Sequence, residues 1–168
     1  MSYSFEEHKH RFAVWAAARS VQRGFACPTK IISKAIDGTD LRKLAFSKRK
    51  WTHKSFDEAH ALLCEKLTFI LRKHNGTYGR AAKIVAIYLK TTIIMSGRPS
   101  DSMLEVIHPP LDGILLKNLA KQKGLSSLRN LRWTSFSQDK YDDVKKQIEA
   151  AGMRFNWRLE NYWKPELE

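Results

Sequence analysis

One apolar segment, residues 81–95, constrains the fold more than any other part of the sequence. Its hydrophobic residues recur at three- and four-residue spacing along one helical face, and further apolar residues fill the flanks of that face. A helix that is apolar around most of its circumference belongs in the interior of a protein. The segment therefore predicts a central, buried helix with other helices packed around it.

Segments with helical spacing lie on both sides of this one. Sequences typical of capping boxes begin at Ser4 and Ser55, and Ser137 is placed to cap a further long helix. The expected helices span residues 5–23, 30–36, 41–46, 56–73, 111–123 and 138–151. Because no segment shows a strand pattern, we predict an all-α fold, a single compact multi-helix domain of about six to eight helices. The domain covers residues 1–168, with residues 153–168 as a C-terminal aromatic arm packed on the body.

Composition and cysteine usage exclude several classes of protein. With 168 residues and 43% hydrophobic residues, the chain can bury the core of one domain. No run reaches the roughly 18 apolar residues of a membrane helix, and the first residues lack the apolar segment of a signal peptide. Cys27 and Cys64 are far apart and neither forms a Cys-x-x-Cys pair. We therefore expect a cytoplasmic protein with no membrane partner, no metal site and no cofactor.

The charge of the chain is its most informative property. Thirty Lys and Arg against seventeen Asp and Glu give a net charge of +13, and residues 42–54 and 113–138 contain no acid. Such basic segments attract polyanions, of which nucleic acid is the commonest, although they can also serve only solubility. We expect a nucleic-acid partner, with DNA favoured. The candidate contacts in these segments are Lys48, Arg49, Lys50, Trp51, Lys54, Lys117, Lys121, Arg129 and Arg132.

Two tryptophans each allow a functional and a structural interpretation. Trp51, within the basic run, can stack on an unpaired base from a loop tip, or it can fold back onto the core. Trp15 shares a helical face with Arg11 and Arg19, a pattern suited to phosphate contact and base stacking. Alternatively, Trp15 is a core residue from whose edge the arginines extend to solvent. We favour the core position for Trp15, because Phe12 beside it also needs a buried face.

Two further features could carry chemistry. The turn Asn-Gly-Thr-Tyr-Gly-Arg at residues 75–80 feeds the central helix and can present backbone N–H groups to an anion, but it lacks the Lys-Ser/Thr ending of a P-loop. His108 lies four residues before Asp112 at the entrance of another helix, where the two side chains can converge. We name both as candidate catalytic residues. An N-terminal helix cap explains Asp112 as well, so the sequence leaves open whether the protein is an enzyme.

A resemblance to a known family covers residues 75–120. The order of glycine turn, Gly-Arg-Ala-Ala-Lys-Ile-Val-Ala helix and Pro-Leu-Asp helix entrance resembles the core of the helix-hairpin-helix DNA glycosylase superfamily. The resemblance implies that Gly76, Gly79 and Arg80 contact DNA phosphate. It also implies that Asp112 stabilises positive charge on the sugar as a base departs. Ala81 stands where bifunctional members carry their catalytic lysine, and the spacing requires an inserted loop at residues 92–107.

Three functions are therefore compatible with the sequence. The first is a basic helical nucleic-acid-binding protein without catalysis of its own. The second is a base-excision enzyme that resembles the glycosylases and uses Asp112 on a flipped base. The third is a helical protein-interaction or oligomerisation module that uses the aromatic C-terminal segment, with Phe155, Trp157, Tyr162 and Trp163. The sequence does not define the oligomeric state.

Overall fold

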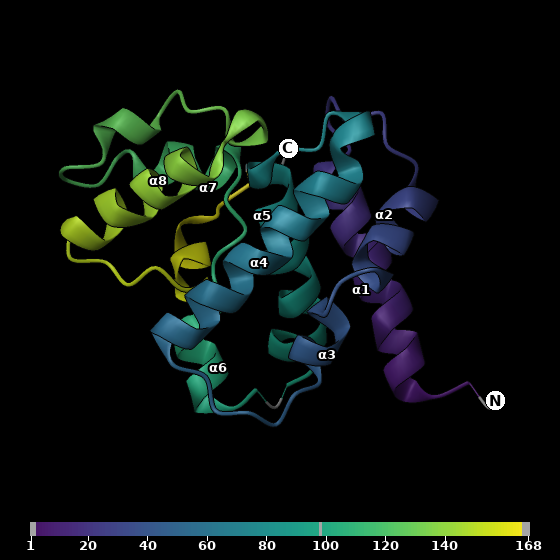
Figure 1. Ribbon diagram of the computed structural model, residues 1–168. Coiled ribbons are helices and arrows are strands. Elements are labelled where there is room, and N and C mark those ends of the chain that lie inside the picture. The colour runs from purple at the N-terminus through teal and green to yellow at the C-terminus, as the bar shows by residue number, and fades with distance from the viewer. Residues whose placement is uncertain (1–2, 98, 166–168) are drawn as a thin grey trace.

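The computed structural model describes residues 3–97 and 99–165, and over these residues the chain is helical with no strand, which confirms the predicted all-α fold (Figure 1). The α-helices are α1 (Phe5–Val21), α2 (Thr29–Asp37), α3 (Leu41–Ala45), α4 (His53–Leu71), α5 (Tyr78–Leu89), α6 (Asp101–Val106), α7 (Gly113–Leu119) and α8 (Gln138–Ala150). Four 3-10 segments, η1 (Arg72–His74), η3 (Ser126–Leu128), η4 (Trp133–Ser135) and η5 (Trp157–Tyr162), and one π-helix, η2 (Lys90–Ile94), complete the described elements.

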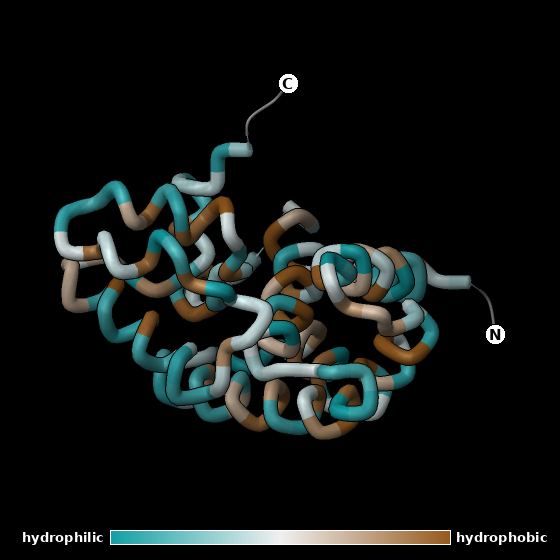
Figure 2. The backbone as a smooth tube through the Cα atoms, turned by 90° about the horizontal axis from the view of Figure 1, so that it is seen from above, coloured by the Kyte–Doolittle hydropathy of each residue, from teal (hydrophilic) through white to brown (hydrophobic). Residues whose placement is uncertain are grey.

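Helix α5 is the centre of the fold, as its apolar sequence predicts. Every residue of α5 is buried except Ile87. The helix packs against both α1 and α4, and Figure 1 shows it behind α4, between α1–α3 on one side and α7 and α8 on the other. The buried apolar residues form a single core that extends from Ala13 to Leu159. In the view from above, hydrophobic and hydrophilic stretches alternate along the chain, as expected for helices with one buried face (Figure 2).

Small residues let α1 approach α5 closely. The buried face of α1 consists mainly of Ala13, Ala17 and Ala18, together with Val14 and Val21. Alanine side chains leave little distance between two helix backbones. His10 also reaches α5, where its Nδ1 lies 2.7 Å from the Tyr88 hydroxyl. The phenylalanines and the tryptophan of α1 lie on its outer side.

The helix starts follow the predicted caps at two of three positions. Ser4 accepts a hydrogen bond from Glu7 N, and Ser137 accepts one from Lys140 N. The third cap is displaced, because α4 begins one turn earlier than expected. Thr52 is its N-cap and Ser55 occupies the reciprocal position of the capping box, where the hydroxyl of each residue accepts from the backbone N–H of the other. The sequence places two hydroxyl residues three apart, and the upstream one caps the helix.

The helix predicted to end at residue 95 changes type after Leu89. Residues Lys90–Ile94 form the π-helix η2. The hydroxyl groups of Thr91 and Thr92 donate to the carbonyl oxygens of Ile87 and Tyr88, each at 2.8 Å. Such back-bonding competes with the regular helical ladder, and π-helical turns occur frequently at functional sites. Here η2 forms one wall of the groove described below.

One helix of the C-terminal half, α7, is shorter than expected. Helix α7 covers only Gly113–Leu119 of the predicted 111–123, because Asp112 is its N-cap in extended conformation and Ala120 is its C-cap. Residues 153–165 pack on the body, and residues 166–168 of the predicted arm lie outside the described part of the chain. Phe155 and Leu159 are buried, and η5 contacts α7 through a 3.0 Å hydrogen bond from Asn118 Nδ2 to the Tyr162 carbonyl oxygen.

Candidate nucleic-acid interface

A groove with a volume of about 770 Å³ lies beside the predicted basic segment. The segment that follows α3 forms one wall, and η2 with the start of α6 forms the other. Among the described residues, its cationic members are Lys9, Lys48, Arg49 and Lys50, and its one acidic member is Asp101. We call this site the basic groove. Four cations against one carboxylate give it a positive potential that favours an anionic ligand.

Hydroxyl groups line much of the remaining groove. They belong to Ser47, Thr92, Ser96, Ser100 and Ser102. Phosphate and sugar oxygens in protein complexes are bound by Lys and Arg together with Ser and Thr hydroxyls. The cations and hydroxyls suit a phosphate-containing ligand, although Thr92 and Ser96 already donate within the fold. The rest of the lining is apolar and consists of Ala45, Phe46, Ile93, Pro99 and Met103.

The four cations of the basic groove make no ion pair with another described residue. In contrast, cations just outside it are paired: Arg42 binds Glu7 at 3.0 Å, and Lys43 binds Asp40 at 2.8 Å. Lys48, Arg49 and Lys50 are also exposed. No carboxylate of the described residues neutralises their charge, although the Arg49 guanidinium lies over the Trp51 ring.

The second basic segment forms a separate surface. Lys117, Lys121, Arg129 and Arg132 are all exposed, and none has an acidic partner in the described part of the chain. They lie on α7 and the connection that follows it, at the opposite end of the molecule from α3 (Figure 1). The two segments with no acid thus do not merge into one patch, and a short ligand can contact only one of them.

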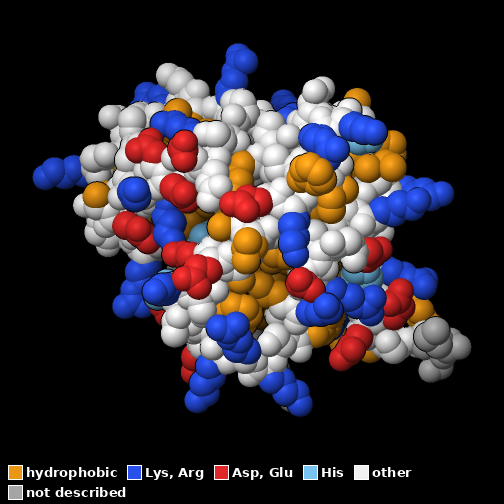
Figure 3. All heavy atoms as spheres, viewed as in Figure 1, with side chains coloured by type: hydrophobic (Ala, Val, Ile, Leu, Met, Phe, Trp, Pro, Cys, Tyr) orange, Lys and Arg blue, Asp and Glu red, His pale blue; other side chains and the backbone are white. Residues whose placement is uncertain are grey.

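The face of the molecule over α4 has a different character. Acidic and basic side chains alternate there around an apolar patch (Figure 3). Leu62 and Phe69 of α4 are among its exposed apolar residues. Mixed charge gives no strong attraction for a polyanion, so this face does not extend the basic groove.

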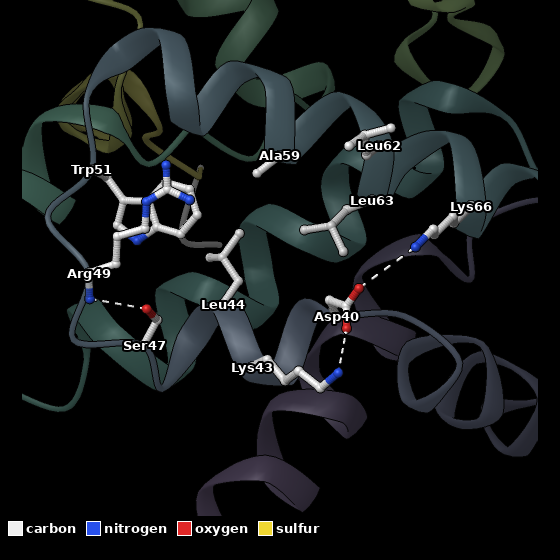
Figure 4. A pocket seen from close by; sticks show the side chains of 10 residues that line it. All are labelled: Asp40, Lys43, Leu44, Ser47, Arg49, Trp51, Ala59, Leu62, Leu63 and Lys66. Atoms are coloured by element: carbon white, nitrogen blue, oxygen red, sulfur yellow. Dashed lines mark hydrogen bonds and ion pairs between the residues drawn. The ribbon is translucent and has the colours of Figure 1, made fainter.

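Trp51 is buried, contrary to the prediction that it contacts nucleic acid. Only 9% of the residue is exposed, and its ring meets Phe56 edge-on at 6.0 Å between ring centroids. Figure 4 shows the Arg49 guanidinium over the indole, 4.6 Å from its centroid, at one end of a pocket of about 290 Å³. The fold covers Trp51 because Phe56 of α4 supplies an apolar surface beside it. Lys54, in the first turn of α4, remains exposed as expected.

Trp15 is exposed, contrary to the prediction that it belongs to the core. Trp15 is 53% exposed and Phe12 is 49% exposed. The two rings stack on each other with centroids 5.7 Å apart and an angle of 29° between their planes. The alanine face of α1 fills the contact with α5, so these aromatic residues point outward.

Lys9 connects the outer side of α1 to the basic groove. Its Nζ lies 5.5 Å from the ring centroid of Phe5 and 5.6 Å from that of Phe46, which lines the groove. Sequence reasoning missed Lys9, because its proximity to the segment after α3 depends on tertiary packing. The spacing of the exposed aromatic residues along α1 was a signal that could have revealed this neighbouring surface.

The glycine turn does not offer the predicted amides to a phosphate. Gly76 N donates to Leu71 O at 3.0 Å and closes the C-terminal turn that follows α4. Gly79 N donates to Phe136 O at 3.1 Å. The predicted phosphate contacts of Gly76 and Gly79 are therefore wrong, since the fold uses both N–H groups. Gly79 is needed for close packing, because a Cβ atom there would lie 2.0 Å from Trp133 O.

Arg80 is likewise structural, and its predicted phosphate contact is wrong. The residue is 8% exposed. Its guanidinium donates to the carbonyl oxygens of Gly24 and Thr134, each at 3.0 Å, and lies over the Phe25 ring. Arg80 thus connects α5 to the backbone at Gly24 and at Thr134. Unlike the groove lysines, it is not exposed to a ligand in solvent.

Asp112 is the N-cap of α7, which confirms the capping interpretation. Its Oδ1 accepts from Leu115 N at 2.9 Å, and its Oδ2 lies 3.3 Å from Lys83 Nζ and 3.0 Å from Trp163 Nε1. Lys83 is nearly buried and its Nζ also lies 4.3 Å from the Trp133 ring centroid. Burial lowers the pKa of Lys83, and the carboxylate of Asp112 opposes this effect.

His108 does not converge with Asp112 as expected. Its Nε2 lies 2.8 Å from Asp57 Oδ1 and its Nδ1 lies 3.2 Å from the Tyr141 hydroxyl. The ring is buried, 4.2 Å from the ring of His60 between centroids. Burial lowers the pKa of His108, although the hydrogen bond with Asp57 acts in the opposite direction. His108 and Asp112 thus belong to two separate polar clusters.

Within residues 3–97 and 99–165, no three His, Cys, Asp or Glu side chains are grouped so that they could hold a metal ion. None of the described helices has the length and apolar character needed to cross a membrane. No family model matches the chain, and no curated protein or solved structure shows significant similarity to it.

Proposed function

We propose that this protein binds nucleic acid through the basic groove. The observation that carries the proposal is that Lys9, Lys48, Arg49 and Lys50 share a hydroxyl-lined groove without an ion pair to any described residue. Free cations beside hydroxyl donors are the groups that proteins use to bind the phosphodiester backbone. The net charge of +13 adds long-range attraction for a polyanion.

The binding energy of such a site comes largely from released counterions. Each phosphate that a lysine or arginine neutralises frees condensed cations into bulk solution, so affinity depends steeply on salt. Four contacts predict that the logarithm of the binding constant falls with the logarithm of salt concentration with a slope of about −3 to −4. The surface formed by Lys117, Lys121, Arg129 and Arg132 adds further contacts only for a ligand long enough to reach it.

A salt titration tests this function. Fluorescence anisotropy of labelled 20-nucleotide DNA, as duplex and as single strand, is measured with the wild-type protein at several salt concentrations. We expect the affinity to fall about 100-fold between about 50 and 200 mM salt. Absence of binding at low salt, or an affinity that does not change with salt, contradicts the proposal. The same titration with RNA shows which polymer is preferred.

A further inference from the structure

We infer that the ligand is a single-stranded nucleic acid, and that its bases stack on an outward aromatic stripe of α1 beside the basic groove. This inference rests on the proposed function and specifies its ligand class. The stripe consists of Phe5, His8, Phe12, Trp15 and Arg19, all of which are exposed. We call it the α1 stripe.

The α1 stripe is a continuous surface on one side of the helix. Its members follow one another at intervals of three or four residues, the spacing at which helical side chains become neighbours. Phe12 and Trp15 are already stacked, which leaves the outer faces of the two rings to solvent. Exposed aromatic side chains of this size are unusual on a solvated helix and mark a binding surface when they are contiguous.

The charge around the stripe is suited to a polyanion. Arg19 has no acidic partner among the described residues and donates only to Gln22 Oε1. Lys30, beside Trp15 in a hollow of about 390 Å³ between α1 and α2, is exposed and makes no ion pair with a described residue, although Glu7 and Asp37 also line this hollow. Arg11 is bound to Glu7 at 2.8 Å, so its charge is partly compensated. No member of the stripe itself is acidic.

The stripe and the groove form one path. Lys9 projects from α1 between Phe5 of the stripe and Phe46 of the groove wall. A strand can therefore place its phosphates in the basic groove while the neighbouring bases reach the aromatic rings. This combination of a charged groove and a row of stacking residues is the general design of proteins that bind single strands.

A duplex cannot use the stripe in this way. Its bases are stacked on each other in the interior of the helix, so only the charged backbone would contact α1. An unpaired base offers a free π-face to Phe12 or Trp15. The structure thus predicts a higher affinity for a single strand than for a duplex, in addition to the salt-dependent attraction that both polymers share.

The test compares matched polymers and two matched variants. Labelled 15-nucleotide oligothymidylate and oligouridylate are titrated by anisotropy beside a hairpin duplex with the same number of phosphates. The double variant Phe12→Leu/Trp15→Leu removes the π-faces and keeps an apolar helix surface. Phe69→Leu removes an aromatic ring that is 65% exposed on α4, away from the stripe, and is the control. Circular dichroism verifies the fold, and Trp15→Leu alone repeats the test with a smaller change.

We expect the wild type to bind a single strand more tightly than the hairpin. The stripe variant should lose at least about tenfold in affinity for the single strand and keep its affinity for the hairpin, while Phe69→Leu changes neither. Equal affinity for all polymers with no effect of the stripe variant overturns the inference but leaves nucleic-acid binding intact. Failure to bind any polymer overturns both. Binding of the wild type and the stripe variant to phosphatidylserine vesicles is measured as well. If the stripe variant loses vesicle binding and keeps its affinity for the single strand, the stripe is a membrane contact and the inference is overturned.

Discussion

Asp57 and His108, which are 51 positions apart in the sequence, are joined by a 2.8 Å hydrogen bond between Oδ1 and Nε2. The bond fixes the segment before α7 against the first turns of α4. Lys145 of α8 donates to the second oxygen of Asp57, and the Tyr141 hydroxyl lies 3.2 Å from Nδ1 of the ring. A neutral ring that donates from Nε2 to Asp57 and accepts at Nδ1 from Tyr141 satisfies all these contacts.

The buried histidines predict that stability falls in mild acid. Burial lowers the pKa of His108, and it lowers that of His60 well below the ordinary value. Below about pH 6.5 the unfolded chain therefore binds protons that the folded chain excludes, so the free energy of unfolding decreases as pH falls. The expected slope is up to about 1.4 kcal/mol per pH unit for each histidine. Urea unfolding at pH 5, 6, 7 and 8 measures it.

Single substitutions distinguish the contribution of the buried histidines to this pH dependence from that of other titratable groups. His60→Phe should reduce the pH slope, because one buried imidazole is removed from a site stacked against Phe56. Leu62→Ala, at an exposed position without a titratable group, should leave the slope as it is. An unchanged slope in His60→Phe would mean that other groups cause the acid sensitivity. Asp57 adds a second loss at lower pH, because hydrogen bonds from His108 and Lys145 outweigh its burial and lower its pKa.

Gly79→Ala should destabilise the fold strongly. A Cβ atom at this position would lie 2.0 Å from Trp133 O, and backbone must move to admit it. We expect a loss of at least about 2 kcal/mol in the free energy of unfolding. Gly113→Ala is the control, since a Cβ atom on that helical glycine meets no atom within 4 Å and alanine favours the helix. Equal urea midpoints for the two variants would refute the close approach of α5 to η4.

Asp112→Ala should also unfold more easily. The variant loses the N-cap of α7 and leaves the nearly buried ammonium group of Lys83 without its carboxylate. We expect a cost of about 3–5 kcal/mol, mostly from the unpaired charge. Asp143→Ala removes a comparable but exposed ion pair with Lys140 and should cost less than about 1 kcal/mol. The double variant Lys83→Met/Asp112→Asn lacks the buried positive charge. If its free energy of unfolding is no higher than that of Asp112→Ala, the unpaired charge of Lys83 does not cause the loss of stability.

The central helix and several caps could be predicted from the sequence because their signals are local. The apolar circumference of α5 and the capping hydroxyls of Ser4 and Ser137 depend on residues within one or two turns. The positions of the two tryptophans depend instead on residues that are distant or on other elements. Trp15 is exposed although the core position was favoured, and Trp51 takes the core position that was one of its two interpretations. Burial of Trp51 requires Phe56 beside it, and Trp15 is exposed because the opposite face of α1, with Ala13, Ala17 and Ala18, packs on α5.

The candidate site was predictable in its charge and not in its shape. Lys48, Arg49 and Lys50 are recognisable because no acid is near them in the sequence. The opposite wall of the groove comes from residues 92, 93, 96 and 99–103, and no local pattern indicates that the two segments meet. The amides of Gly76 and Gly79 could not be judged from the sequence either, because their acceptors Leu71 and Phe136 are set by the fold.

The most direct test of nucleic-acid binding at the basic groove compares two variants that each lose three positive charges. One carries Lys48→Gln, Arg49→Gln and Lys50→Gln, and the other carries Lys34→Gln, Lys73→Gln and Lys146→Gln at exposed, scattered positions. The affinity for a labelled 20-nucleotide single strand is measured over a range of salt concentrations. We predict that the groove variant loses at least about tenfold in affinity and that its salt slope becomes shallower by about 2 to 3, while the scattered variant stays within about threefold of wild type. Equal losses in the two variants, or wild-type affinity in the groove variant, would contradict binding at the basic groove.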